Sequence, residues 1–158
     1  MATQDAVTKQ YVSEAEVFAD AFKYLMYDGE QVIRPENLKD MDTTQYVLPY
    51  GEKGHPEAAQ KYRDVLKTLA IKTDENCTYL VLGIENQSSV HYAMPVRNML
   101  YDAMQYEKQV RELAKAHRRE HDTGTPEEYL SGMKKEDRLI PVVTLVINFG
   151  DRAWDGPL

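Results

Sequence analysis

The sequence has a single cysteine, Cys77, and it lacks a glycine-rich phosphate loop, a long apolar run and an apolar N-terminal segment. One cysteine excludes an internal disulfide framework and a cysteine-based zinc cluster. Because no apolar run approaches the roughly 20 residues that a membrane helix needs, we expect no membrane partner. The polar N-terminus also lacks the apolar core of a signal peptide. Together these absences predict a cytoplasmic protein.

Basic residues are also in deficit, since 19 Lys and Arg stand against 26 Asp and Glu, which gives a net charge of -7. This balance argues against a protein that coats nucleic acid through bulk charge. It does not exclude an enzyme that meets DNA with a local basic stripe and holds a divalent cation with carboxylates. A chain of 158 residues suits one compact domain. We assign residues 1–12 to a flexible N-terminus and residues 13–158 to that domain.

The spacing of apolar residues predicts helices and strands in a mixed order. Ser13 and Glu16 have the spacing of a capping box, and the amphipathic helix that follows them ends at Asp28-Gly29. We predict a short strand near residues 45–48, strands over 63–71 and 78–85 with a turn between them, and a last strand within 138–149. This order predicts an α/β (α+β) domain in which a central mixed sheet is flanked by helices.

A long helix is predicted to start at Pro95, which is well suited to the first turn of a helix. We expect its apolar side to be buried, and that side consists of Val96, Leu100, Ala103, Val110, Ala114 and His117.

The two strands before the long helix predict a carboxylate pair. If the turn places Ile71 opposite Thr78, the same register places Asp64 opposite Glu85, with Cβ atoms roughly 4.5–5.5 Å apart. Two carboxylates this close repel each other unless a cation lies between them, and Mg²⁺ fits that role. Because strand side chains alternate, Gln87 shares the side of Glu85 and could orient a water or a phosphate oxygen. The alternative is that Glu85 merely marks the point where the strand meets solvent.

A basic stripe is predicted on the long helix. Lys108, Arg111, Lys115 and Arg118 follow i, i+3, i+7, i+10 spacing, so they could track a phosphate backbone. The alternative is an ordinary solvated helix face. Glu107 with Arg111, and Lys108 with Glu112, have the i, i+4 spacing of common ion pairs.

His117 and His121 are also four residues apart, as in a helical zinc site. The Glu that a metalloprotease helix carries directly after its first His is absent, because Arg118 stands there. We identify no third ligand and therefore do not predict zinc.

Four runs of the sequence, in this order, resemble a known family: "VFADAFKYLMYDGEQVI", "KYRDVLK", "YLVLGIENQSSVHYAMPVRNMLYDAMQY" and "LIPVVTLVINFG". The chain resembles the recombination-promoting nuclease / putative transposase family, which belongs to the PD-(D/E)XK nuclease superfamily. The resemblance covers about residues 17–157, and "GIENQS" before "YDAMQY" is its most specific part. It implies a restriction-endonuclease-like αβββαβ core, Mg²⁺-dependent cleavage of double-stranded DNA, and Mn²⁺ as an alternative ion.

The resemblance also implies roles for individual residues. Asp64 in "YRDVL" matches the motif aspartate, Glu85 the motif glutamate and Gln87 the usual lysine position, which leaves open what activates the attacking water. A backbone carbonyl near Asn86 would assist in metal binding. Asp20 on the first helix would match an acidic residue that supports the metal site. Gln105 and Tyr106 resemble a Gln/Tyr motif that contacts substrate or braces the site.

Family members usually continue beyond the point where this chain stops, at "DRAWDGPL". We therefore expect the family's C-terminal extension to be absent while the hydrolytic core is complete. The extension could supply DNA contacts or oligomerisation, and a homodimer is one arrangement that we consider. The rival hypothesis is a catalytically inactive interaction module, or a remnant of a mobile element, and both Gln87 and the acidic surface favour it.

Overall fold

Two long strands form the central hairpin of the protein. The computed structural model describes residues 4–41, 44–47, 59–62, 65–73, 76–87 and 89–156. Strands β4 (Val65–Thr73) and β5 (Asn76–Gln87) pair antiparallel across a two-residue connection. Both strands were predicted from the sequence and are confirmed, although β4 runs on to Thr73 and β5 begins at Asn76, inside the segment predicted as a turn.

The hairpin lies inside a four-stranded mixed sheet with the order β1-β4-β5-β6. The edge strand β1 (Leu38–Asp40) pairs antiparallel with β4, while β6 (Val142–Asn148) pairs parallel with β5. β6 follows Pro141 and is rich in β-branched residues, which favour a pleated, half-buried strand. Strands β2 (Thr44–Val47) and β3 (Ala59–Tyr62) form a separate two-stranded sheet. The fold is therefore α+β with a mixed sheet, as predicted.

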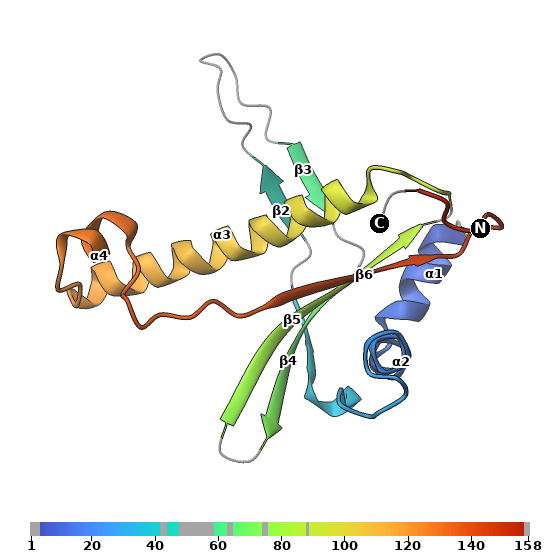
Figure 1. Ribbon diagram of the computed structural model, residues 1–158, viewed down its shortest axis with the longest axis horizontal. Helices are drawn as coiled ribbons and strands as arrows, with labels where there is room; N and C mark the ends of the chain where they lie inside the picture. Colours follow the sequence, from blue (N-terminus) through green and yellow to red (C-terminus); the bar gives the residue numbers. More distant parts are fainter. Residues whose placement is uncertain are drawn as a thin grey trace.

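Helices complete the regular elements of the described residues (Figure 1). Near the N-terminus, α1 (Gln4–Ser13) and α2 (Ala15–Met26) are followed by a short 3-10 turn, η1 (Pro35–Asn37). After β5 come the long helix α3 (Met94–Glu120) and the one-and-a-half-turn α4 (Pro126–Ser131). Within the described residues, none of these helices has the length and apolar character needed to cross a bilayer.

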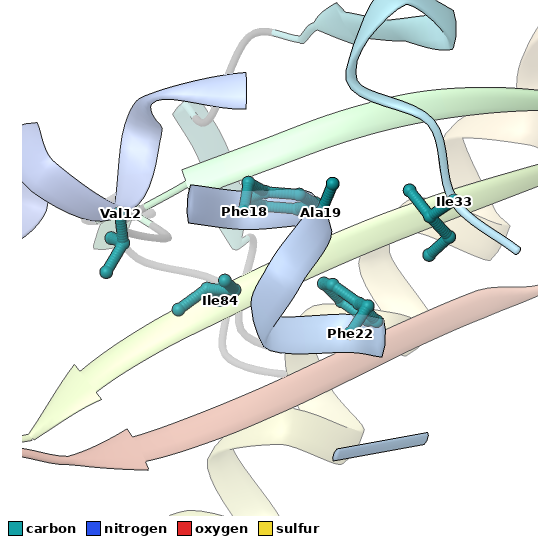
Figure 2. Packing of buried hydrophobic residues seen from close by; sticks show 6 residues of the cluster. All are labelled: Val12, Phe18, Ala19, Phe22, Ile33 and Ile84. Atoms are coloured by element: carbon teal, nitrogen blue, oxygen red, sulfur yellow. The ribbon is translucent and has the colours of Figure 1, made fainter. Parts of the chain in front are cut away.

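One face of the sheet is covered by the N-terminal helices, and the main core lies there (Figure 2). Phe18 and Phe22 on α2 are completely buried, with ring centroids 5.1 Å apart, and Ile84 of β5 is buried beside them. Burying side chains of this size stabilises the fold by roughly 1.5–3 kcal/mol each. The β6 positions that pack against this cluster are Val143, Leu145 and Ile147.

The other face of the sheet is joined to α3 mainly through polar contacts with β6. The Thr144 hydroxyl donates to Asp102 Oδ1 at 2.8 Å. The backbone N–H of Val142 donates to the Tyr106 hydroxyl at 3.1 Å. Residues 142 and 144 alternate with the core-facing positions 143 and 145, so α3 lies on the face opposite α2.

The predicted buried side of α3 is wrong in its first half. Val96 and Met99 are 67% and 70% exposed, and Ala103 is exposed as well, whereas Tyr101 and Gln105 are buried. The physical reason is that α3 joins the sheet through hydrogen bonds that its polar side chains accept from β6. Only the end of the predicted apolar stripe, at Ala114 and His117, is buried.

The N-terminus also differs from the prediction. Helix α1 occupies most of the segment that we assigned to a flexible terminus. Val12 on α1 is 2% exposed and belongs to the core cluster, so this helix packs against the core. The predicted capping box at Ser13 is wrong, since the Ser13 hydroxyl donates back to the carbonyl of Gln10 at 2.6 Å. The cap residue of α2 is Glu14, and its side chain makes no capping hydrogen bond. The strands β1 and β3 were not predicted.

Candidate metal and nucleic-acid site

The register of the β4–β5 hairpin agrees with the prediction. Ile71 pairs with Thr78, and the nine described pairs run without a bulge to Val65 opposite Ile84. Asp64 lies outside the described residues. The structure describes the backbone of residues 85–87 but not their side chains. The pairing of Asp64 with Glu85 is the next step of this register, and it stays a prediction.

The end of β5 is also paired on its other edge. Glu85 is aligned with Val146 of the parallel strand β6, and Gln87 is aligned with Asn148. Ile84 faces the core below α2, so alternation assigns strand positions 85 and 87 to the opposite face, on which α3 lies. The candidate residues therefore belong to the face whose described contacts are polar.

Helix α3 contributes two of the predicted residues near this face. Gln105 is 4% exposed, so its side chain is enclosed by protein. The Tyr106 hydroxyl accepts the backbone N–H of Val142, the first residue of β6, and so joins that strand to α3. Bracing of the metal site itself stays a prediction. A contact of either residue with substrate stays a prediction.

Sequence reasoning missed Asp102, which lies one turn before Tyr106. Its carboxylate accepts the hydroxyl of Thr144, the residue aligned with Gly83 two positions before Glu85. The sequence signal was present in "YDAMQY", where Asp102 and Tyr106 have i, i+4 spacing on one helix face. The sequence alone did not show that this side of α3 contacts β6.

Asp20, predicted to support the metal site, is exposed on α2. The buried face of α2 consists of Phe18, Ala19 and Phe22, and this helix covers the Ile84 side of the sheet. The predicted support from Asp20 therefore has no geometric basis within the described ranges.

A lysine is buried in the hairpin, and it could be mistaken for the missing motif lysine. Lys67 is 4% exposed, its Nζ lies 2.5 Å from Asp40 Oδ1, and the same atom lies 5.5 Å from the centroid of the Phe18 ring. The contact with Phe18 places Lys67 on the α2 face, opposite strand position 85. Lys67 therefore joins the edge strand to the core and does not replace Gln87 at the candidate site.

The predicted basic stripe is present as a set of exposed side chains on α3: Lys108, Arg111, Lys115 and Arg118. Arg111 is engaged by Glu107 through N–O contacts of 2.5 and 2.6 Å, as the alternative of a solvated helix face predicts. This pair holds the pKa of Arg111 above its ordinary value, chiefly through the hydrogen bond to Glu107.

A shallow surface hollow of about 480 Å³ lies along this part of α3. Three cations of the stripe, Arg111, Lys115 and Arg118, line it together with Glu107, Val110 and Ala114. Among the side chains that the structure describes, no ion pair involves Lys108, Lys115 or Arg118. Lys108, Lys115 and Arg118 are therefore the members of the stripe best placed to meet an anionic partner.

Within the part of the chain that the structure describes, no group of three or more His, Cys, Asp or Glu side chains could hold a metal ion. Asp64 and the side chain of Glu85 lie outside the described part of the chain, so the predicted metal pair stays a prediction. His117 and His121 do not converge, because His121 caps α3 in a left-handed conformation and is exposed.

Comparisons with family models, with curated proteins and with solved structures find no match to this chain.

Proposed function

We propose that this chain is a Mg²⁺-dependent DNA endonuclease domain with a restriction-endonuclease-like αβββαβ core, as its resemblance to the recombination-promoting nuclease / putative transposase family implies. The observation that carries the proposal is the hairpin register, which reaches Val65 opposite Ile84, one step before Asp64 and Glu85. The parallel strand β6 beside β5 and the long helix between them support the same core. Localisation in the cytoplasm belongs to this proposal.

The residues assigned to the site fit a hard divalent cation. Asp64 and Glu85 would offer carboxylate oxygens, and the backbone near Asn86 a carbonyl oxygen, which are the ligands that Mg²⁺ prefers. Mn²⁺ takes similar oxygen ligands, so it is the alternative ion. When bound, the ion would supply Lewis-acid catalysis of phosphodiester hydrolysis.

The chain's own residues would orient the substrate around that ion. Gln87 cannot supply positive charge, so its amide would position the attacking water or a phosphate oxygen. Tyr106 would hold β6 beside the active strand through its bond to Val142. Lys108, Lys115 and Arg118 would contact the phosphate backbone of double-stranded DNA, and Arg111 would join them if DNA displaced Glu107.

A second candidate function is a non-catalytic interaction module that keeps the fold of a nuclease. It is favoured by Gln87 at the lysine position and by the net charge of -7. A nuclease should bind Mg²⁺ through Glu85, whereas the module or a remnant of a mobile element needs no metal at all.

One experiment distinguishes the two functions. Supercoiled plasmid is incubated with the chain, with Mg²⁺, with Mn²⁺ and with EDTA, beside Glu85→Gln and the control Glu112→Gln, an exposed acid on α3. The endonuclease predicts nicked or linear product with either ion, lost in Glu85→Gln and kept in Glu112→Gln. Intact plasmid in every lane with folded protein would favour the interaction module. Cleavage that survives Glu85→Gln would overturn the site.

A further inference from the structure

The imidazole of His117, near the end of α3, lies between two carboxylates. Its Nδ1 is 2.8 Å from Asp122 Oδ1, and its Nε2 is 3.0 Å from Asp137 Oδ2. The residue is only 9% exposed. An ionised carboxylate can only accept, so both contacts are hydrogen bonds only when each ring nitrogen carries a proton. The geometry is therefore that of a protonated imidazolium.

This arrangement leaves His117 no free nitrogen. A general base or a metal ligand needs an unprotonated ring nitrogen directed at its partner, and here both nitrogens are directed at carboxylates. The contacts instead join the end of α3 to two points of the following segment. Those points are Asp122, directly after α3, and Asp137, beyond α4.

Further contacts close the same segment. The Lys134 backbone N–H donates to Asp137 Oδ2 at 2.7 Å, and the Lys134 ammonium lies 3.4 Å from Asp122 Oδ2. Gly132, in the left-handed conformation that ends α4, is packed so tightly on α3 that an added Cβ would lie 2.4 Å from the Cβ of Ala114. These contacts fold residues 121–138 back along α3, and α4 lies within that fold (Figure 1).

Lys134 shares Asp122 with the His117 ring, whereas the other charged groups around His117 are engaged elsewhere or face solvent. Lys134 also lies 3.5 Å from Glu136 Oε1. On α3 itself, Arg118 and Arg119 are exposed, and Arg119 pairs with Glu120 at 3.0 Å. On the α4 side, Glu128 closes a capping box with Thr125, and Glu127 is exposed. Asp122 and Asp137 are therefore the two carboxylates in contact with the ring.

We propose that His117 is a pH-sensitive latch that fastens residues 121–138, with α4 among them, to the end of α3. Loss of one ring proton turns a donor nitrogen into a lone pair that faces a carboxylate, so one of the two bonds is replaced by repulsion. Opening frees α4, on which Tyr129 and Leu130 are 77% and 87% exposed, and it uncovers Ala114. The latch is independent of the proposed nuclease activity.

The charges around the ring set the direction of the effect. The hydrogen bond to Asp122 is the largest cause that raises the pKa of His117 above its ordinary 6.5; burial opposes it, and the bond to Asp137 adds to it. The carbonyl end of α3 also favours a cation at this position. A raised pKa means that the stabilisation is complete below pH 6.5, and that it is lost as the pH rises through the folded-state value.

The latch is tested by NMR and hydrogen exchange on the full chain between pH 6 and pH 9. We expect the His117 ring to titrate above the ordinary histidine pKa of 6.5. The protection factors of amides 121–138, corrected for intrinsic exchange, should fall by up to about tenfold per pH unit between pH 6.5 and the His117 midpoint, and should level off above it. His117→Gln should show low protection of this segment at every pH, whereas the control His91→Gln should keep the parental profile.

Two results would overturn the latch. One is a His117 midpoint at or below the ordinary histidine pKa of 6.5. The other is equal protection of residues 121–138 at pH 6 and pH 9 in the parent chain. If His117→Gln does not fold, these two measurements on the parent still decide the question.

Discussion

Val65 pairs with Ile84 at the last described step of the β4–β5 ladder, and Ile84 is completely buried against α2. A strand position this rigidly packed fixes the register of its neighbours, because a slip by one residue would move Ile84 out of the core. The same packing assigns Glu85 to the opposite face. The first prediction rests on this relationship.

Removing one carboxylate from the proposed pair should not harm the metal-free protein. We expect Asp64→Asn or Glu85→Gln to leave the metal-free Tm equal or slightly raised, because two adjacent carboxylates repel each other. The parent should gain about 2.7 kcal/mol when Mg²⁺ is present at 100 times its Kd, and the variants should lose that gain. Calorimetry with and without Mg²⁺ measures both effects.

Glu112→Gln, on the exposed side of α3, is the control, and it should keep the full response to Mg²⁺. A purely structural role for the pair predicts the reverse pattern, in which the variants are less stable and Mg²⁺ has no effect on the parent. If Mg²⁺ stabilises parent and variants alike, the metal site lies elsewhere.

Lys67 provides a second prediction, because its position separates a structural lysine from a catalytic one. Lys67→Met keeps an unbranched apolar side chain at this buried position and removes a buried charge, so we expect stability within about 1 kcal/mol of the parent and cleavage that is retained. Lys67→Ala should cost about 2 kcal/mol, because it removes the packing as well. Urea denaturation and the plasmid assay measure the two quantities.

Asp40→Asn is the matched control for the ion pair. The Asp40 side chain is 83% exposed, and the asparagine oxygen can still accept from the Lys67 ammonium, so this change should cost less than Lys67→Ala. Loss of cleavage in a folded Lys67→Met variant would contradict the placement of Lys67 on the structural face of the hairpin.

The central hairpin and β6 were predictable, because short apolar and β-branched runs bounded by a turn carry local information about strands. The contacts of α3 were not. Hydrophobic periodicity favoured Val96 and Ala103 as its buried side, while the helix is held by Asp102 and Tyr106, whose bonding partners lie 42 and 36 residues further on. A helix held by polar contacts of this kind lacks the regular spacing of apolar residues from which a buried side is predicted.

The role of His117 was hidden for a related reason. The sequence paired it with His121, its neighbour at i, i+4, but the residues that bind its ring are Asp122 and Asp137, which lie 5 and 20 residues away. The second of these lies beyond α4, so the contact depends on how the chain folds back. Helix α1 was missed because most of its residues are polar, and the buried Val12 is a weak signal alone.

The basic stripe provides a third prediction, now with a sharper choice of residues. Changing Lys108, Lys115 and Arg118 together to Ala should weaken binding to duplex DNA and reduce the slope of log K against log salt by up to about 2.7, at about 0.9 per phosphate contact. Fluorescence anisotropy measures this slope between 50 and 300 mM KCl. That range spans ~0.8 log units of salt concentration, which is wide enough to define the slope.

Arg111→Ala is the comparison variant, since Glu107 already engages that guanidinium. It should change the slope by less than the average of the other three. If the triple variant keeps the parental slope, these side chains belong to a solvated helix face and DNA binds elsewhere.

Gly132 provides the last prediction, which tests the contact that seats α4 on α3. The residue has φ of 73°, and an added Cβ would lie 2.4 Å from the Cβ and 3.2 Å from the Cα of Ala114. Gly132→Ala should therefore cost about 2–4 kcal/mol, from the left-handed backbone and the overpacking together. The double variant with Ala114→Gly removes the nearer clash but adds the cost of a glycine within a helix, about 1 kcal/mol. A double-mutant cycle in urea should show favourable coupling between the two sites, since the effects of contacting residues are not additive.

Gly29→Ala is the matched control: Gly29 also has positive φ, at 90°, but nothing lies within 4 Å of the position that its Cβ would take. Gly29→Ala should therefore lose only the stability that the left-handed backbone costs. Equal losses of stability in Gly29→Ala and Gly132→Ala, with no coupling to Ala114, would mean that α4 does not pack on α3 in solution.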